Sequence, residues 1–185
     1  MHGADDFWVF GYGSLMWRPG FSYLESRPAL LRGYHRSFCV YSHHYRGTPE
    51  HPGLVLGLAR GGACRGIAFR VDVADEQSVK SYLDERELVS YAYTPRTIAV
   101  SLRDITVHCY TFVANTRHDQ YAGDLGVERS AEIIMSAQGI AGLNRDYLIN
   151  TVRQLEKEGF SDKRLGQLLK RVEHLTGIIE AGSGI

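Results

Sequence analysis

The chain has 185 residues, of which 44% are hydrophobic and 23% charged, and its 21 lysines and arginines balance 21 aspartates and glutamates. A chain of this length and composition can enclose one sizeable core, so we expect a single domain over residues 1–185. The zero net charge creates no overall field to attract nucleic acid or an anionic membrane, which leaves at most a local patch and favours a small-molecule partner.

The three cysteines, Cys39, Cys64 and Cys109, lie far apart and form no C-x-x-C pair, and their odd number argues against a closed disulfide framework. We expect reduced thiols that serve as inert core residues. No stretch of about 18 apolar residues is present to cross a bilayer, and the first ten residues carry two acids where a signal peptide would be positively charged. These features predict a soluble, cytoplasmic protein that has no membrane partner.

The first 114 residues alternate short apolar and β-branched runs with glycines, a pattern typical of strands. In one run Ile67, Phe69 and Val71 alternate with an alanine and an arginine, which indicates a sheet with one buried face and places Phe69 in the core. The polar segment 42–52 is expected to be an exposed loop. The expected strands are residues 7–12, 36–42, 53–59, 64–72, 96–102 and 105–114.

One helix is expected to interrupt the strands, because residues 75–91 open with acids suited to a helix N-terminus and place Val79, Tyr82 and Leu83 at helical spacing. After residue 126 the apolar period becomes helical throughout. Strands first and helices later predict an α+β domain. The later helices are marked by Ile133, Ile134 and Ala137, then by Leu148, Val152 and Leu155, and finally by Leu165, Leu168, Leu169, Val172 and Leu175.

A glycine-rich stretch, Gly11-Tyr12-Gly13-Ser14-Leu15, follows the first expected strand. Such a turn lets backbone N–H groups converge on an anion, because glycine permits positive φ and close approach. The stretch matches neither the dinucleotide-binding nor the P-loop fingerprint. An anion site and a tight strand exit without a ligand are therefore equal alternatives from local chemistry alone.

Three acids, Asp84, Glu85 and Glu87, are crowded beside Arg86 at the end of the expected helix. Acids at a helix C-terminus oppose the helix dipole at a cost of roughly a few tenths of a kcal/mol each, so helix stability does not explain all three. One of them is a candidate for chemistry, although a solvated charged turn is the commoner origin of any single acid.

Histidine and tyrosine supply few further candidates. His43 and His44 are adjacent, so their side chains point in different directions, and no third ligand lies at helical spacing. We therefore expect a surface pair and no metal site. Of the 11 tyrosines, Tyr121 stands in the polar, glycine-bearing segment RHDQYAGDLG, where a phenol can line a pocket.

Five strings in this chain resemble those of the ChaC-like γ-glutamylcyclotransferases, in the same order and at similar spacing. The resemblance covers roughly residues 7–175 and identifies a reaction that composition and periodicity do not name. One string alone would carry little weight, and five in order are hard to obtain otherwise. The strings are VFGYGSLMWRPGF, YRGTPEHPGLVLGL, GGACRGIAFRV, VKSYLDERE and YAGDL.

The resemblance implies an enzyme that acts on glutathione, cyclising its γ-glutamyl group to 5-oxoproline and releasing Cys-Gly, with no metal or organic cofactor. It also implies a small mixed β-barrel-like sheet with flanking helices. Two alternatives stay open. One is a cyclotransferase for other γ-glutamyl peptides, amino acids or amines, and the other is a non-catalytic module that binds γ-glutamyl compounds.

Carried over position by position, the Y-G-S-L loop of the family falls on Tyr12, Gly13, Ser14 and Leu15, which should hold the α-carboxylate and amine end of the γ-glutamyl group. The catalytic glutamate of the family, in an R-E pair after Y-L-D, falls on Glu87. A glutamate that accepts a proton from an amine needs a raised pKa, so we expect Glu87 in a desolvated pocket.

Two further residues are matched less directly. Tyr121 corresponds to a pocket tyrosine of the family, and its hydroxyl is a candidate oxyanion donor, as are the backbone amides of residues 13–15. Arg46, in YRGTPE, is a candidate for pairing with the glycine carboxylate of glutathione.

Overall fold

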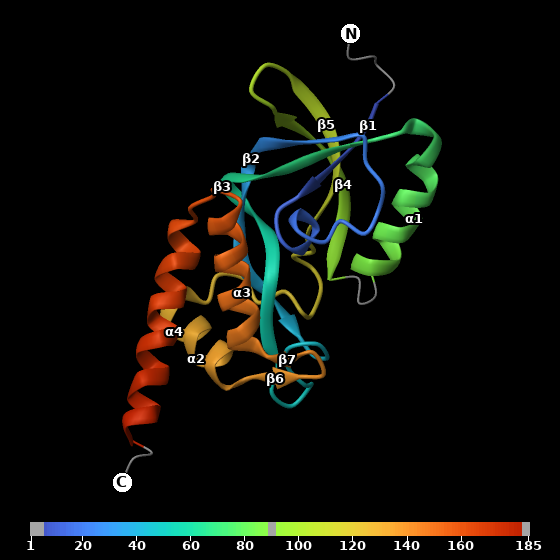
Figure 1. Ribbon diagram of the computed structural model, residues 1–185. Helices are drawn as coiled ribbons and strands as arrows, with labels where there is room; N and C mark the ends of the chain where they lie inside the picture. Colours follow the sequence, from blue (N-terminus) through green and yellow to red (C-terminus); the bar gives the residue numbers. More distant parts are fainter. Residues whose placement is uncertain (1–5, 89–91, 183–185) are drawn as a thin grey trace. The chain divides into compact units, whose positions relative to one another are not determined.

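The computed structural model describes residues 6–88 and 92–182 and forms two compact units (Figure 1). The first unit holds residues 1–36 and 57–118, and the second holds 37–56 and 119–185. The single domain expected over residues 1–185 stays a prediction. The elements are β1 (Phe7–Gly11), η1 (Ser14–Met16), β2 (Glu25–Ser42), β3 (Gly53–Val71), η2 (Val73–Asp75), α1 (Glu76–Glu87), β4 (Tyr93–Ser101), β5 (Thr106–Ala114), α2 (Gly126–Ser136), β6 (Gln138–Gly139), β7 (Gly142–Leu143), α3 (Asn144–Lys157) and α4 (Lys163–Gly182).

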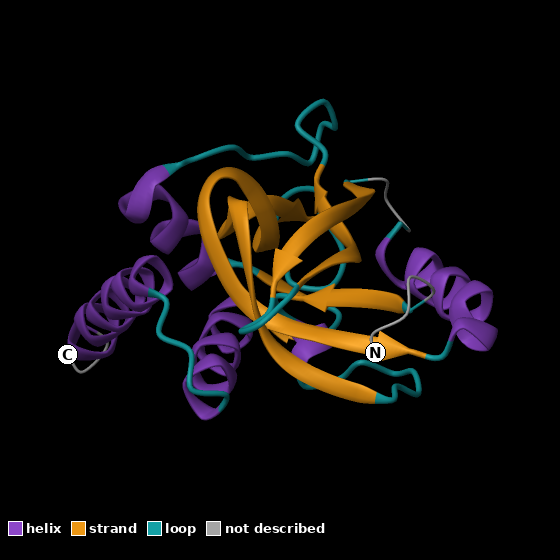
Figure 2. Cartoon of the chain, turned by 90° about the horizontal axis from the view of Figure 1, so that it is seen from above, coloured by secondary structure: helices purple, strands orange, loops and turns teal. Residues whose placement is uncertain are grey.

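Five strands close into a barrel in the order β1-β3-β2-β4-β5, and Figure 2 shows them in orange, curving round on themselves. β1 pairs antiparallel with β3 and parallel with β5, where Val9 lies opposite Tyr110. β4 and β5 form an antiparallel hairpin from the Tyr93–Ala114 pair to the Ser101–Thr106 pair. Closure leaves no unpaired sheet edge. The α+β class and the barrel implied by the resemblance are both confirmed.

Helix α1 covers one face of the barrel in the first unit. Val79 and Leu83 of α1 pack with Val9, Phe69 and Phe112, all of which are buried. Neighbouring strand residues point to opposite faces, so the residues between these apolar ones point into the barrel. They are buried as well, since Phe10 and Ala68 have no exposed surface. The expected core position of Phe69 is confirmed, whereas the expected single buried face is wrong because the sheet closes on itself.

The long strands β2 and β3 differ most from the sequence-based expectation. Residues 53–59 and 64–72 were expected as two strands, yet β3 runs unbroken from Gly53 to Val71. Gly61 and Gly62, with φ of +99° and +68°, lie inside β3 and do not end it, because glycine adopts a positive φ without strain. β2 begins at Glu25 and not at residue 36, because pairing with its neighbours in the barrel overrides the weak strand propensity of Pro28, Gly33 and the charged residues of its first half.

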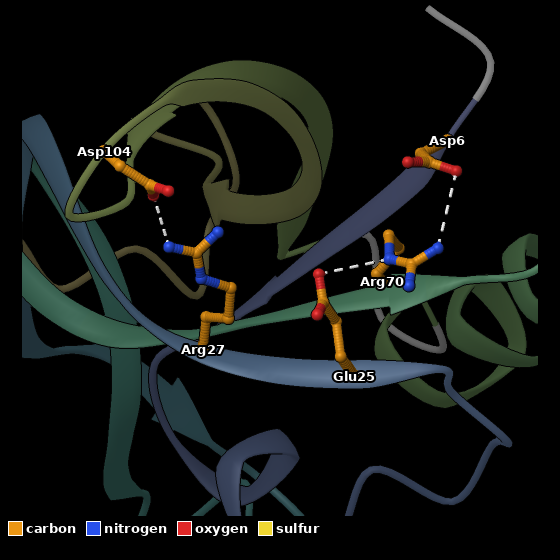
Figure 3. Close-up of polar contacts among 5 residues, drawn as sticks. All are labelled: Asp6, Glu25, Arg27, Arg70 and Asp104. Carbon is orange, nitrogen blue, oxygen red and sulfur yellow. Dashed lines mark hydrogen bonds and ion pairs between the residues drawn. The ribbon is translucent and has the colours of Figure 1, made fainter. Parts of the chain in front are cut away.

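Three ion-pair contacts connect β2 and β3 with each other and with neighbouring segments (Figure 3). Arg70 of β3 lies between Glu25, with Nε 3.1 Å from Oε1, and Asp6, with Nη1 3.8 Å from Oδ1. Arg27 of β2 pairs with Asp104 in the turn between β4 and β5. These groups are partly exposed, so each pair contributes roughly 0–1 kcal/mol and the buried apolar residues carry the stability.

The second unit contains helices α2, α3 and α4 and the short β6–β7 hairpin, which was not expected from the sequence. The predicted helical stretches are confirmed, and Ile134, Leu148 and Leu155 are buried. Buried Asn144, the first residue of α3, donates from its side-chain amide to the carbonyl of Leu54 and accepts from its N–H, both at 2.8 Å. This reciprocal pair fixes the start of α3 to β3.

Cys39, Cys64 and Cys109 are buried free thiols, as expected. Burial raises the pKa of Cys39 to about 11 and that of Cys109 to about 12, so both remain protonated and unreactive at neutral pH. Among the helices that the structure describes, none is long and apolar enough to span a membrane.

Packing inside the barrel predicts a contrast between two glycine substitutions. A Cβ at Gly66 would overlap the carbonyl oxygen of Gly11 and lie 2.7 Å from Cζ of Phe10, so Gly66→Ala should lower the free energy of unfolding by about 1–3 kcal/mol. Gly166 of α4 has open space at the same atom, and Gly166→Ala should raise that free energy by up to about 1 kcal/mol. Urea unfolding of both variants checks this, and equal effects would contradict the packing.

Candidate active site

The chain leaves β1 through a tight buried turn. Tyr12 and Gly13 are buried, and the 3₁₀ turn η1 follows, with the N–H of Met16 donating to the carbonyl of Gly13 at 2.9 Å. A Cβ on Gly11 would lie 3.1 Å from Cβ of Leu15, so close approach explains this glycine. Gly13 has φ of −138°, so this glycine does not use the left-handed conformation.

A buried arginine fixes the strand exit. The Arg36 guanidinium of β2 is 4% exposed, and its Nε donates to the carbonyl oxygen of Tyr12 at 2.6 Å. Its Nη2 donates to the carbonyl of Arg65 on β3. Arg36 thus joins the loop to two strands of the barrel, a role that sequence reasoning missed.

A second arginine, Arg86, connects this loop to the last turn of α1. Its Nη2 donates to Oγ of Ser14 at 2.8 Å, and its Nη1 donates to the carbonyl of Arg18 at 2.7 Å and to the hydroxyl of Tyr82 at 3.1 Å. Its Nε lies 3.6 Å from Oε1 of Glu87. One planar guanidinium therefore holds the Y-G-S-L loop, the following chain and the acid of the R-E pair in one arrangement.

The loop after η1 also depends on a glycine at the helix. Gly20 has φ of +74°, a conformation that favours glycine, and a Cβ there would overlap the hydroxyl of Tyr82 and lie 2.7 Å from its Cζ. Gly20 therefore lets the chain pack against the same tyrosine that bonds Arg86. Gly20 and Tyr82 both stand in the strings that carry the resemblance, but they are far apart in the sequence, so their packing gives no local signal.

The three clustered acids of α1 have three different environments. Oδ1 of Asp84 accepts a 2.5 Å hydrogen bond from the hydroxyl of Tyr110, which helps burial to raise the pKa of that phenol. Glu85 is exposed. Glu87 is only 21% exposed, and Arg86 is its ion-pair partner. Among these acids, Glu87 alone is both withdrawn from water and next to the loop-binding arginine.

Two opposing effects set the protonation of Glu87. Burial disfavours the carboxylate and raises the pKa above its ordinary value of 4.5, while the Arg86 charge lowers it by a smaller amount. The expected desolvated environment of Glu87 is therefore observed. A carboxyl with a raised pKa can take and return a proton near neutral pH, which is the property of a general acid and base.

The first unit brings together Tyr12, Gly13, Ser14, Leu15 and Glu87. The other two predicted residues, Arg46 and Tyr121, belong to the second unit.

In the second unit, the Nη1 of Arg46 donates to the carbonyl of Leu143 at 3.1 Å, and its guanidinium lies 5.5 Å from the ring centroid of Tyr147. Tyr121 forms a bridge with Val40, and burial, followed by Cys39 and Asp124, raises its pKa.

The exposed loop 43–52 carries His43 and His44 on the surface, as expected. Within the part of the chain that the structure describes, no three His, Cys, Asp or Glu side chains lie close enough together to hold a metal ion.

Comparison with known proteins identifies the family. The family model described as ChaC-like protein matches residues 7–175. The chain belongs to the ChaC-like family. The loop at residues 12–15 and the Arg86-Glu87 pair both lie within the matched residues.

Two relatives and one solved structure are similar to this chain over most of its length. The glutathione-specific γ-glutamylcyclotransferase of Escherichia coli K12 is 36% identical over 169 residues, which span 91% of this chain and 73% of that protein. The human glutathione-specific γ-glutamylcyclotransferase 1 is 30% identical over 179 residues, spanning 94% of this chain and 77% of that protein. A crystal structure of a yeast γ-glutamylcyclotransferase specific to glutathione shares the fold, with a TM-score of 0.82, 22% identity and coverage of 92% and 99%.

The buried environment of Glu87 predicts how stability depends on pH. Between the ordinary value of 4.5 and the raised pKa, the folded protein binds a proton that the unfolded chain has lost, so stability falls as pH rises, by about 1.4 kcal/mol per pH unit. Glu87→Gln cannot ionise, and it should be more stable than wild type at neutral pH, with an advantage that disappears toward pH 4.5.

Urea unfolding across this pH range checks the expectation. Glu85→Gln, on the exposed side of the same turn, controls for the loss of one negative charge. A stability difference between wild type and Glu87→Gln that does not change with pH would contradict a raised pKa at Glu87.

Proposed function

We propose that this chain is a glutathione-specific γ-glutamylcyclotransferase, which converts glutathione to 5-oxoproline and Cys-Gly. The observation that carries the proposal is the connection Ser14–Arg86–Glu87, which joins a loop suited to the α-amino-acid end of the substrate to a carboxyl with a raised pKa. The names of the Escherichia coli and human relatives, both glutathione-specific γ-glutamylcyclotransferases, support the same substrate.

The reaction needs no covalent nucleophile from the protein. The α-amine of the γ-glutamyl group attacks its own γ-carbonyl carbon, and the bond to the cysteine nitrogen breaks. Tyr12, Gly13, Ser14 and Leu15 hold the α-carboxylate and amine so that the chain folds into a five-membered ring. Orientation of this kind contributes on the order of 7 to 11 kcal/mol in well-aligned intramolecular reactions, so gripping the substrate is a large part of catalysis.

Glu87 moves the proton. The α-amine has a pKa near 8 and is mostly an ammonium, which must lose a proton before it attacks. Desolvation of Glu87 narrows the gap between its pKa and that of the amine, so it accepts this proton and then donates one to the leaving cysteine nitrogen. The oxyanion that forms at the γ-carbonyl needs hydrogen-bond donors. The backbone amides of residues 13–15 and the Tyr121 hydroxyl both remain predicted donors.

The activity is tested by 5-oxoproline release from glutathione, with γ-glutamyl-alanine as the competing substrate. Wild type should turn over glutathione with the higher kcat/KM, and Glu87→Gln should lose about 10²- to 10⁴-fold in kcat, which is the usual worth of such proton transfer. Turnover by folded Glu87→Gln within tenfold of wild type would contradict the role of Glu87. Folded wild type that releases no 5-oxoproline from either substrate would favour a binding module.

Arg86 is expected to act as a positioning residue. Arg86→Gln removes the charge that lowers the pKa of Glu87, so the acidic limb of the pH profile of kcat/KM should move to higher pH, and Arg86→Lys should move it less. Both variants should lower kcat, because neither glutamine nor lysine has the guanidinium whose two Nη groups reach Ser14 and the carbonyl of Arg18 together.

Arg18→Gln is the matched control, since the network uses only the backbone carbonyl of this exposed residue. Its pH profile should match that of wild type. A profile that is the same in Arg86→Gln and wild type would show that Arg86 has a structural role alone.

A further inference from the structure

A cavity of about 400 Å³ in the first unit has a strongly basic lining. Arg60 of β3, Arg96 of β4 and Arg117, which follows β5, all line it. None of the described residues that line it is acidic. Within the described part of the chain, none of these three guanidiniums is in an ion pair. Three uncompensated positive charges around a cavity of ligand size indicate a site for a small anion.

The cavity is lined by residues of β2, β3, β4 and β5. β2 pairs with β4 at Leu30 and Ser101, and farther along these two strands Tyr34 and Thr94 both line the cavity. Val113 faces Thr94 across the β4–β5 ladder and closes the inner wall. The site is thus built from barrel strands, and the cavity is distinct from the residues proposed to hold the γ-glutamyl group.

Strand register places the cavity at the same end of the barrel as the Y-G-S-L loop. β1 runs parallel to β5 with Val9 opposite Tyr110, so the exit of β1 at Tyr12 lies at the end of β5 where Val113 lines the cavity. Arg36, two residues after Tyr34 on β2, binds the carbonyl of Tyr12.

The start of β4 lies beside the cavity too. The N–H of Asn115, a lining residue, donates to the carbonyl of Ala92 at 2.8 Å, and β4 begins at the next residue. Ala92 is five positions after Glu87 in the sequence.

We propose that this cavity binds the carboxylate at the glycine end of glutathione, through Arg60, Arg96 and Arg117. The inference rests on the proposed function and names the group that would separate a tripeptide substrate from other γ-glutamyl compounds. Guanidinium groups bind carboxylates through paired, charge-assisted hydrogen bonds, and an exposed cavity admits the polar end of a leaving dipeptide. Arg46, the residue expected from the sequence for this carboxylate, already bonds Leu143 and stacks on Tyr147, so the observations favour the cavity.

The test compares glutathione with its glycine monoethyl ester, in which the glycine carboxylate is replaced by a neutral ester. Calorimetric binding to the Glu87→Gln chain, which separates binding from turnover, should show glutathione binding about 10- to 100-fold more tightly than the ester. Adding Arg60→Gln, Arg96→Gln and Arg117→Gln together should bring this ratio close to one. Each single substitution should lower the ratio severalfold and serves if the triple variant does not fold.

Arg103→Gln is the matched control, because this exposed arginine lies in the turn at the opposite end of the β4–β5 hairpin. It should leave the ratio unchanged, and so should Arg46→Gln. A ratio near one in the starting chain, or a ratio that survives in the folded triple variant, would overturn the inference.

Kinetics give an independent readout in the presence of Glu87. The cavity substitutions should raise KM for glutathione by about tenfold or more and change kcat much less, because they remove binding that is equal in the ground and transition states. Absence of 5-oxoproline release by wild type would refute the proposed function alone, since the binding ratio is measured without turnover.

Discussion

The site depends on one guanidinium. Arg86 bonds Ser14 and the carbonyl of Arg18 on one side and lies 3.6 Å from the Glu87 carboxylate on the other. The loop comes from the exit of β1 and the acid from the last turn of α1, two segments that share no local sequence. Without this contact, the loop and the acid would be held by separate elements. With it, a shift of the loop changes the electrostatic environment of the acid.

The barrel makes that contact possible. α1 packs Val79 and Leu83 on Phe69 and Phe112, which fixes the helix that carries Glu87, and Arg36 holds the carbonyl of Tyr12 to β2. Burial raises the pKa of Glu87, and the positive charge of Arg86 limits the rise. A fully exposed glutamate would stay ionised and be a weak base toward an ammonium, whereas a buried one without a cation would bind its proton too firmly to exchange it.

Periodicity and composition predicted β1, β4, β5 and the helices, because these elements bury regular apolar faces. The same signals missed the first half of β2, where charged residues, Pro28 and Gly33 surround a short apolar run, and divided β3 at Gly61 and Gly62, since strand pairing in a closed barrel overrides local propensity. The motifs placed Glu87 and the Y-G-S-L loop in the sequence, but not the bond that joins them, because Ser14 and Arg86 are 72 residues apart. The three arginines that line the cavity, Arg60, Arg96 and Arg117, are likewise scattered along the chain and meet only through strand register.

The central claim is that the carboxyl with the raised pKa is the group that moves the proton. The most direct measurement is the carbon NMR titration of the Glu87 side chain, compared with the pH profile of kcat/KM for glutathione. The account predicts that the acidic limb of the profile coincides with the titration of Glu87 at a pKa above 4.5. Activity that passes unchanged through the titration of Glu87 would contradict it.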